Sequence, residues 1–458
     1  MNSFFRGLLV LSLAAFVGEC LELFINVVLA RELGDEAFGM YMAILPTMLF
    51  VVVLANMELP VSISKLIAEQ EPNYHWSVLI HALKLATVCA ATVMLLAVWI
   101  LPMLPVFDDY HTGIQWLMIL LVPVISFSAV VKGYLIGAQK TGMIAIANVL
   151  KRTCQLLGLL FVFSFFSWES DTAIFMALLA LKLSELLVLT YLVTVFIINM
   201  RRIKKAKSST MPWAEARKKL LAVSVPTTGL RVFHSATFAI KPFLITWALG
   251  NAGMIESIAS LEYGKLAGIA FTIGFFPAFI AHALLIVLIP IVADSYEKKD
   301  FRTLHHYLKL SILVTIVYGA PVILAFYAFS DTITNLFFEE STASAYLTIL
   351  VPYFLFHYFA IPLQAYLIGI GLVRDAFIHS LYSTIISFIL MLYLGSLPSL
   401  QMDGIILGMN MGAVLLTLMH YVTICEKLGL NVMLGRKNGA LLHNETYRLH
   451  RVTIALYD

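Results

Sequence analysis

Apolar residues run along this chain in stretches of about 20 residues or more, and short polar segments separate them. A transmembrane helix needs about 20 mostly apolar residues, because each residue advances it 1.5 Å through a hydrocarbon core about 30 Å thick. The pattern therefore predicts an all-α integral membrane protein with twelve transmembrane helices, over residues 5–30, 41–59, 79–106, 113–137, 143–166, 172–200, 220–249, 266–292, 304–329, 345–369, 376–397 and 404–424.

Composition agrees with this prediction. The 458 residues are 61% hydrophobic and only 12% charged, whereas soluble domains carry about 25% charged residues. The four cysteines stand singly in apolar stretches, and no cysteine or histidine spacing suits a metal ion. Phosphate-binding glycine loops and hydrolase motifs are also missing. We therefore expect a protein that is not an enzyme and that has neither a bound metal nor a cofactor.

The distribution of charge predicts the orientation, because Lys and Arg accumulate near helix ends on the cytoplasmic side. With the N-terminus inside, the external loops hold only two basic residues, Arg31 and Lys265. The internal loops and the tail hold many more: Lys65, Lys132, Lys140, eight in residues 201–219, Lys298, Lys299, Arg302, Arg374, Lys427, Arg436, Lys437, Arg448 and Arg451. The expected location is the plasma membrane, with both termini in the cytoplasm.

The segment 201–219 holds eight of the chain's 30 Lys and Arg residues. In a soluble protein such a run would suggest a nucleic-acid partner. Between two sets of six apolar spans it is better explained as a cytoplasmic linker, and no nucleic-acid partner is expected. The predicted organisation is a six-helix lobe over residues 1–200, a basic linker over 201–219, a second six-helix lobe over 220–430 and a cytoplasmic tail over 431–458.

Three short segments recur in order in the two halves of the chain. Phe38-Gly39-Met40 is similar to Tyr263-Gly264-Lys265, Leu59-Pro60 to Ile289-Pro290, and Tyr134-Leu135-Ile136-Gly137 to Tyr366-Leu367-Ile368-Gly369. Six spans separate the copies, so both lobes have the same orientation in the membrane. This predicts parallel repeats, related by an axis along the membrane normal.

The same segments resemble a known family. Ala30-Arg31-Glu32-Leu33-Gly34, residues 59–69, Gly133–Gln139 and Gln364–Gly371 are similar to helix ends of the multidrug/oligosaccharidyl-lipid/polysaccharide (MOP) flippase superfamily. The similarity is greatest to its polysaccharide transporter branch, which includes O-antigen-type flippases and the stage V sporulation protein B group. The resemblance implies two six-helix lobes around a central cavity, alternating access, and export of a lipid-linked oligosaccharide or polysaccharide precursor for the cell envelope or a spore layer.

The resemblance specifies the fold better than the substrate. The family's peptidoglycan-precursor flippases have arginines on the first helix, whereas this chain has Glu19 and Glu22 there. A cation-coupled multidrug exporter of the same superfamily is therefore an alternative, and a non-transporting membrane scaffold is another. The expected partners are a lipid-linked saccharide and membrane lipids, with the protein itself a monomer.

Charged residues inside the predicted spans are candidates for function, because a charge near the bilayer centre costs about 2.5–3.5 kcal/mol on insertion scales. Glu19 and Glu22 share one face of the first span with Asn26. They either bind a coupling proton or cation or act as a counter-charge in the cavity, or they form a structural pair with a basic residue on another helix. The sequence leaves both explanations open, as it does coupling to the membrane potential.

Span seven carries Arg231, His234 and Lys241. Aligning the starts of spans one and seven places Glu19 opposite Arg231 and Glu22 opposite His234. We hypothesise that the three basic residues face the cavity and hold the phosphate of a lipid carrier, and that protonation breaks an ion pair between the lobes. The alternative is a permanent Glu–Arg pair with no role in transport.

Four further charges are weaker candidates. Lys182 and Glu185 are three residues apart in span six and are expected to neutralise each other. Lys151 and Arg152 in span five either line an inward-facing vestibule or extend to lipid headgroups. The single histidines His282 and His357 are expected to be hydrogen-bonded core residues rather than ligands.

Overall fold

The computed structural model describes residues 3–103, 107, 110–138, 140–165, 170–203, 210–338 and 342–431. Eleven continuous stretches of helix in these residues are long and apolar enough to cross a membrane. The first of them, Ala15–Glu69, contains two of the predicted spans, because Gly34 interrupts it with the non-helical angles φ 72° and ψ 172°. The protein is thus an all-α membrane protein with twelve spans, as the sequence predicts.

The first lobe comprises α1 (Ser3–Asn56), α2 (Leu59–Glu69), α3 (His75–Ile100), α4 (Gly113–Gly137), α5 (Thr141–Phe165) and α6 (Ser170–Ile203). The second lobe comprises α7 (Trp213–Asn251), α8 (Glu256–Gly264), α9 (Phe271–Phe275), α10 (Phe279–Glu297), α11 (Phe301–Phe338), α12 (Thr342–Ile349), α13 (Val351–Gly369), α14 (Val373–Gly395) and α15 (Gln401–Leu428). Residues 204–209 of the basic linker and the tail from residue 432 onward lie outside the described residues.

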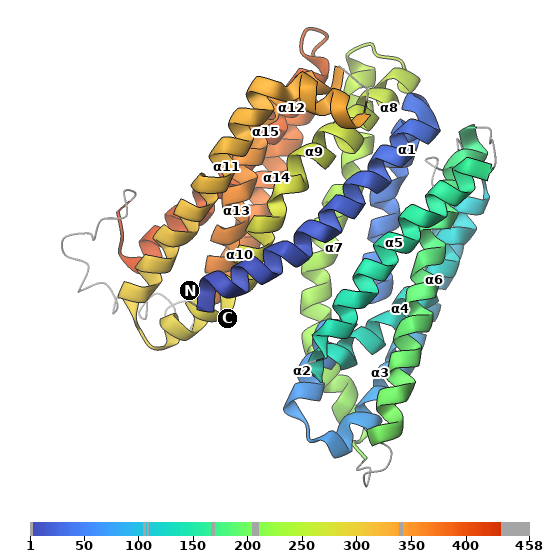
Figure 1. Cartoon of the computed structure of the whole chain (residues 1–458), viewed down its shortest axis with the longest axis vertical. Helices are drawn as coiled ribbons and strands as arrows, with labels where there is room; N and C mark the ends of the chain where they lie inside the picture. Colours follow the sequence, from blue (N-terminus) through green and yellow to red (C-terminus); the bar gives the residue numbers. More distant parts are fainter. Residues whose placement is uncertain are drawn as a thin grey trace, which may run out of the picture.

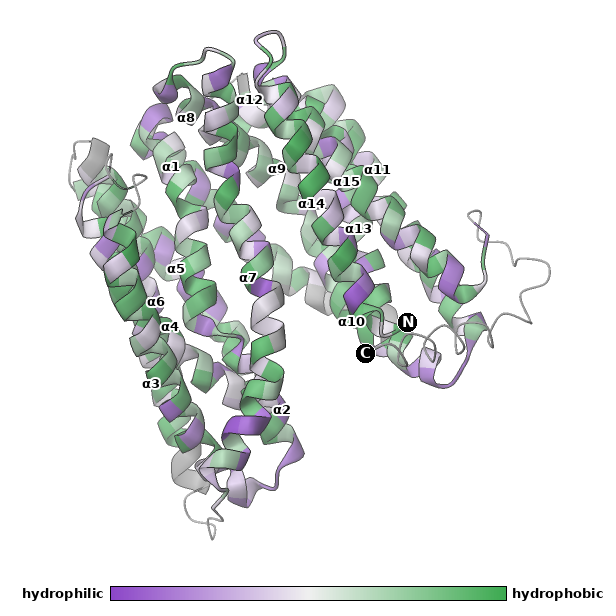
Figure 2. Ribbon diagram, turned by 180° about the vertical axis from the view of Figure 1, so that it is seen from behind, coloured by the Kyte–Doolittle hydropathy of each residue, from purple (hydrophilic) through white to green (hydrophobic). Residues whose placement is uncertain are grey.

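The two lobes meet at one end of the molecule, near α8, and diverge toward the other end, where α2 lies (Figure 1). The N-terminal half of α1 runs obliquely between them. Apolar residues cover most of the helix lengths, while polar residues are more frequent near the ends, for example around α2 and α8 (Figure 2). The largest buried apolar cluster contains residues of both lobes, whereas the other clusters are smaller.

Span two is longer than the sequence predicts. The prediction ends it at Leu59, but the helix resumes as α2 and continues to Glu69. A kink separates the two parts, because Met57 and Glu58 both adopt left-handed backbone angles, with φ of 44° and 47°. Pro60 follows within the first turn of α2, where its missing N–H costs no helical hydrogen bond. Glu58 consequently lies within the span and not in a loop.

Span eight is irregular. After α8 the chain forms a π-helical segment, Lys265–Ala270, then α9, a 3₁₀ turn over Phe276–Ala278 and finally α10. Pro277 lies in the 3₁₀ turn, and proline removes a donor from the helical ladder. Segments of π-helix inside α-helices are uncommon and occur frequently at functional sites. This span faces α1, as the contacts below show.

The beginning of α7 packs on the first lobe. Ala216 and Leu220 belong to the same buried cluster as Leu59 and Ile63 of α2. Farther along, Leu244 of α7 belongs to the cluster shared by both lobes. The helix that begins the second half of the sequence therefore has its first turns in the core of the first half.

Candidate functional site

Seven charged side chains lie together within the first lobe, and we call them the N-lobe charge cluster: Glu19, Glu22, Lys132, Lys151, Arg152, Lys182 and Glu185. Arg152 of α5 forms an ion pair with Glu22 of α1, and Lys151 of α5 forms one with Glu185 of α6. Lys132 and Lys182 interact electrostatically with Glu185. Four cations and three carboxylates leave the cluster with one excess positive charge when all are ionised.

The two ion pairs point in different directions because of helix geometry. Consecutive residues of an α-helix differ by about 100° around its axis, so the adjacent Lys151 and Arg152 face different neighbours. Lys151 reaches α6 and Arg152 reaches α1. The sequence predicted that Lys182 would neutralise Glu185 on the same helix. In the structure Glu185 forms its ion pair with Lys151 of α5, and Lys182 also interacts with it electrostatically.

The helix α1 contacts the second lobe as well. The Nδ2 of Asn26 donates a hydrogen bond to Oγ1 of Thr272, over 3.2 Å. The ring of Phe16 packs edge-on against Phe276 and Phe279, with centroid distances of 5.8 and 5.4 Å. Glu19 interacts electrostatically with Arg152 of the first lobe and with His282 of the second. The predicted face of Glu19, Glu22 and Asn26 therefore lies between the lobes.

Arg231 of α7 pairs with a residue that the sequence did not single out. Its Nε lies 2.9 Å from Oε1 of Glu58, whose side chain is 10% exposed. Two turns earlier on α7, the hydroxyl of Ser224 donates to the carbonyl of Met57. These two contacts join α7 of the second lobe to the kink in span two. Glu58 stands out in the sequence as a single charge beside Leu59-Pro60. It was not predicted to be an intramembrane charge, because the predicted span ends at Leu59.

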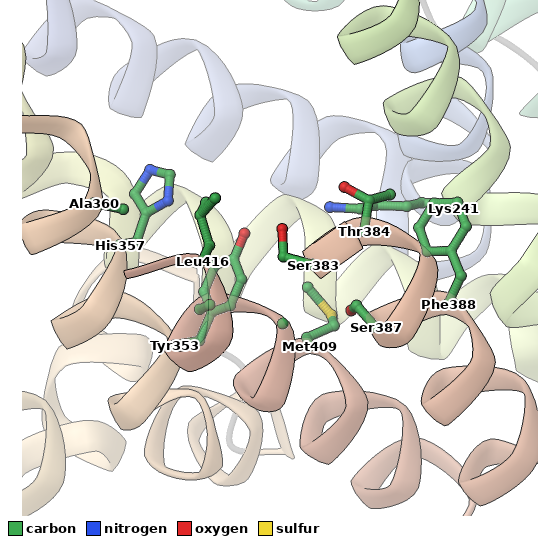
Figure 3. A pocket seen from close by; sticks show the side chains of 12 residues that line it. Lys241, Tyr353, His357, Ala360, Ser383, Thr384, Ser387, Phe388, Met409 and Leu416 are labelled. Carbon is green, nitrogen blue, oxygen red and sulfur yellow. The ribbon is translucent and has the colours of Figure 1, made fainter. Parts of the chain in front are cut away.

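Of the three basic residues of α7, Arg231 and His234 interact electrostatically, whereas Lys241 lies apart from them in a cavity that neither of them lines. His234 is exposed, and its ring is 5.5 Å from that of Phe233. Lys241 lines a cavity of about 110 Å³ in the second lobe (Figure 3). We call this the Lys241 cavity, and it is lined by Lys241, Tyr353, His357, Ala360, Ser383, Thr384, Ser387, Phe388, Met409, Gly412, Ala413 and Leu416.

The polar residues of the Lys241 cavity are hydrogen-bond donors or neutral hydroxyls, and none is a carboxylate. Ser383 and Ser387 donate to the carbonyls of Ser380 and Gly408, so their hydroxyls are available mainly as acceptors. No hydrogen bond is formed by the side-chain oxygens of Thr384 or Tyr353 with the part of the chain that the structure describes. Lys241 also has no carboxylate within ion-pair distance among the described residues. This arrangement suits an anion and not a metal cation.

Aromatic rings fix one wall of the cavity. The ring of His357 stacks on that of Tyr353 at 5.8 Å and meets that of Phe275 edge-on at 5.0 Å. His357 interacts electrostatically with Lys241 and His282. His357 is therefore a neighbour of both Lys241 and His282. Nothing in their sequence spacing indicated this, because the three residues come from different helices.

A side chain from α15 holds Tyr353 in place. Between α12 and α13, the amide of Asn410 donates to the carbonyl of Ile349 over 2.9 Å and accepts from the N–H of Tyr353 over 3.0 Å. An unbroken α-helix would join that N–H and that carbonyl directly. The side chain of Asn410 therefore replaces one backbone hydrogen bond, and it connects the cavity wall to α15.

A pair of buried histidines was also missed. The Nδ1 atoms of His379 on α14 and His420 on α15 are 3.0 Å apart, and Oγ1 of Thr423 lies 3.3 Å from Nε2 of His379. Within the described residues, no group of three or more His, Cys, Asp or Glu side chains is arranged to hold a metal ion.

Comparison with known proteins agrees with this architecture. The family described as "Polysaccharide biosynthesis protein" matches residues 4–296, and the family described as "MatE" matches residues 264–390. The chain is 47% identical to "Sporulation protein YkvU" of Bacillus subtilis (strain 168) over 434 residues, which cover 95% of this chain and 98% of that protein. It is 28% identical to "Stage V sporulation protein B" of the same organism, over 94% of this chain and 85% of that protein.

Solved structures show the same fold. An inward-facing multidrug resistance MATE family transporter of the MOP superfamily has a TM-score of 0.74 at 15% identity, covering 90% of this chain and 94% of that one. An outward-facing transporter of that family has a TM-score of 0.66 at 15% identity, covering 93% and 96%. With its twelve spans in two lobes and the match over residues 4–296, the chain belongs to the polysaccharide biosynthesis protein family of the MOP superfamily of membrane transporters.

Proposed function

We propose that the protein is an alternating-access flippase, which exports a lipid-linked oligosaccharide or polysaccharide precursor across the plasma membrane for the cell envelope or a spore layer. The observation on which this rests is the Lys241 cavity. It presents a lysine, a histidine and hydroxyl groups without any carboxylate, inside a lobe of membrane helices. Phosphate is the charged group of a lipid carrier, and charge-assisted hydrogen bonds to phosphate are among the stronger ones in proteins.

In this proposal Lys241 neutralises one phosphate charge, while Thr384 and Tyr353 donate hydrogen bonds to its oxygens. Arg231 is committed to Glu58, so it positions α7 rather than binding the substrate. His234 lies three residues from Arg231 on an exposed face and contacts the substrate only when the saccharide passes along α7. Of the three basic residues that the sequence suggested for the phosphate site, only Lys241 binds the phosphate in this proposal.

The shape of the molecule supports an inward-facing state. The lobes meet near α8 and diverge toward the end at which α7 begins (Figure 1). By the distribution of Lys and Arg, that end faces the cytoplasm. The similarity to the inward-facing MATE transporter, with a TM-score of 0.74 against 0.66 for the outward-facing one, agrees with this assignment. A lipid-linked substrate would then enter from the cytoplasmic leaflet.

The N-lobe charge cluster supplies the counter-charge in this mechanism. Glu19 interacts electrostatically with Arg152 of the first lobe and with His282 of the second, so its charge acts on both. Protonation of Glu19 would remove that attraction and favour separation of the lobes. Protons are accordingly the coupling ion that we propose, acting alone or with the membrane potential.

The sporulation names of the two Bacillus subtilis relatives support a spore layer as the destination. The alternative of a cation-coupled multidrug exporter is supported by the MatE match over residues 264–390. A cationic drug needs a carboxylate that is not already neutralised. In the N-lobe charge cluster, however, cations outnumber carboxylates, and the Lys241 cavity has no acid. The alternative of a non-transporting scaffold does not explain a cavity lined by hydrogen-bond donors.

The test is a flipping assay with the purified protein in proteoliposomes, using a fluorescent disaccharide linked to a polyprenyl diphosphate. We expect Lys241→Ala to slow flipping at least about tenfold, because a hydrogen bond to a charged group contributes about 1.5–3 kcal/mol and each 1.4 kcal/mol is a factor of ten. Lys241→Arg should keep part of the rate. The matched control is Lys309→Ala, an exposed lysine of α11. Normal flipping by Lys241→Ala would refute the proposed phosphate site.

A further inference from the structure

A second hollow, about 600 Å³ in volume, lies at the seam between α3 and the first turn of α7. Its lining is Ile80, Leu83, Lys84, Thr87, Val88 and Trp213. Apart from Lys84 and the hydroxyl of Thr87, these groups are apolar. We call this the α3–α7 groove. It shares no lining residue with the Lys241 cavity. The only helix that contributes to the lining of both is α7, through Trp213 here and Lys241 there.

Hydrogen bonds and a contact between aromatic rings join α3 to the start of α7. The N–H of Met211 donates to the hydroxyl of Ser77 over 2.9 Å, and Nε2 of His81 lies 2.8 Å from the carbonyl of Met211. A carbonyl only accepts, so that nitrogen of His81 donates. The rings of His81 and Trp213 are 5.3 Å apart. Met211 of the basic linker is therefore held against α3, and Trp213 lies beside the groove.

Lys84 is the charged residue of this groove. It is the tenth residue of α3, about 14 Å along the axis from His75, and it is exposed on a membrane-spanning helix. None of the carboxylates that the structure describes lies within ion-pair distance of it. A lysine there is stable only if its ammonium reaches an anion or water at the membrane surface.

Trp213 indicates where that surface lies. Tryptophan is enriched at the level of the lipid headgroups, and Trp213 is 37% exposed at the start of α7. Because it lines the same groove as Lys84, the lysine ammonium can extend to headgroup level. Ile80, Leu83 and Val88 give the groove an apolar wall. Arg217 and Lys218, both exposed on α7, add positive charge at this end.

We propose that the α3–α7 groove binds one anionic phospholipid, with its phosphate on Lys84, its glycerol region against Trp213 and an acyl chain along the apolar wall. The charge complementarity favours an anionic lipid over a zwitterionic one, since each basic residue near a membrane surface attracts anionic lipid by about 1 kcal/mol. This lipid bridges α3 and α7, and so it joins the first lobe to the helix that begins the second. It is a structural lipid and is not the transported substrate.

The internal repeat provides a matched control. His81-Ala82-Leu83-Lys84-Leu85 of α3 recurs as His306-Tyr307-Leu308-Lys309-Leu310 of α11. Lys309 is also exposed, nine residues into its helix, but it does not line the α3–α7 groove. A lysine that only extends to bulk lipid should behave alike at both positions. A lipid held by the groove should depend on Lys84 alone.

The experiment uses the full chain purified in mild detergent and exposed to phosphatidylglycerol or phosphatidylcholine, with bound lipids counted by native mass spectrometry. We expect one retained phosphatidylglycerol per wild-type chain. Lys84→Ala should weaken its binding about fivefold, which corresponds to the roughly 1 kcal/mol of one lysine. Lys84→Arg and Lys309→Ala should retain it, and Val88→Trp, which fills the groove, should displace it.

Equal losses for Lys84→Ala and Lys309→Ala, or equal retention of the two lipids, would overturn the proposal, because either result means that the lipid is only part of the surrounding bilayer. A wild-type chain that retains no lipid and forms dimers through this groove would also overturn it. Thermal unfolding gives a second measurement, in which phosphatidylglycerol should stabilise wild type and Lys309→Ala more than Lys84→Ala. Flipping of the saccharide is not needed for either readout.

Discussion

Gly39 and Gly264 occupy equivalent positions in the two halves of the sequence, and in the folded protein they touch each other. A Cβ on Gly264 would lie 2.5 Å from Cα of Gly39, and a Cβ on Gly39 would lie 2.5 Å from the carbonyl oxygen of Ser260. Equivalent residues of two repeats meet only where the axis relating the repeats passes between them. The contact at which the lobes close is therefore on that axis, and only glycine fits there.

This contact predicts the effect of a larger side chain. Gly39→Leu should destabilise the closed end by about 1–3 kcal/mol, the usual cost of overpacking. The buried Ala37, 3% exposed, should then become reachable. The measurement is labelling of an Ala37→Cys variant, in a cysteine-free background, by a membrane-impermeant maleimide.

Gly250→Leu is the matched control for that experiment, since a Cβ at Gly250 meets no atom within 4 Å. Faster labelling is expected with Gly39→Leu and unchanged labelling with Gly250→Leu. If Gly39→Leu labelled at the wild-type rate, the glycine pair would not be what closes this end.

A second prediction concerns the ion pair of Glu58 and Arg231. Arg231→Ala leaves a carboxylate that is 10% exposed without its partner, and an unsatisfied buried group costs about 1–3 kcal/mol or more when it is charged. Glu58→Gln should cost less, because the amide is neutral. The melting temperature of the detergent-solubilised protein should follow this order.

The double variant Glu58→Gln with Arg231→Ala should be more stable than the sum of the single changes implies, since no charge is then left without its partner. Strict additivity would indicate that the two side chains do not interact in the membrane.

A third prediction concerns Glu185. Its side chain is 14% exposed and pairs with Lys151, while Lys132 and Lys182 also interact with it. Glu185→Gln raises the excess charge of the N-lobe charge cluster from one to two. We expect a loss of about 1–3 kcal/mol in the free energy of unfolding, measured by chemical denaturation.

The comparison for this variant is Glu69→Gln, which breaks the exposed pair with Lys65. Exposed ion pairs contribute about 0–1 kcal/mol, so little change is expected there. Similar losses in both variants would mean that water reaches the N-lobe charge cluster as freely as it reaches the end of α2.

The sequence predicted the spans and their repeat because these depend on runs of apolar residues, which need no tertiary information. It also placed Glu19, Glu22 and Asn26 on one face, since that follows from helical spacing. It did not give the partners of Glu22 and Arg231. Helices that are apolar all round carry little information about which face meets which neighbour. Consecutive residues of a helix point about 100° apart, so the adjacent Lys151 and Arg152 have different partners.

The Lys241 cavity was only partly predictable for a related reason. Lys241 was identified as an intramembrane charge, but His357 was expected to be an ordinary core residue. Their proximity depends on the path of α13, and that path depends on the break at Leu350. No local signal marked Asn410, sixty residues later, as the side chain that completes this break.

A fourth prediction follows from that bond. Asn410→Leu leaves the N–H of Tyr353 and the carbonyl of Ile349 unpaired, at a cost of about 1–3 kcal/mol each. It should lower both the melting temperature and the rate of flipping, because Tyr353 lines the Lys241 cavity. Asn410→Asp keeps an acceptor for Tyr353 but no donor for Ile349, and so it should have an intermediate effect.

Met411→Leu, next along α15 and 52% exposed, should change neither quantity. If Asn410→Leu lowered stability while flipping stayed normal, Tyr353 would not be part of the substrate site.

The position of Ala216 and Leu220 in the core of the first lobe has a consequence for biosynthesis. Chains emerge from the ribosome N-terminus first, and domains commonly fold as they emerge. Here the first repeat lacks part of its own interior until the opening turns of the second repeat have been made. The boundary between the two sequence repeats is thus not the boundary of an independently folding unit. The two halves must therefore complete their folding together.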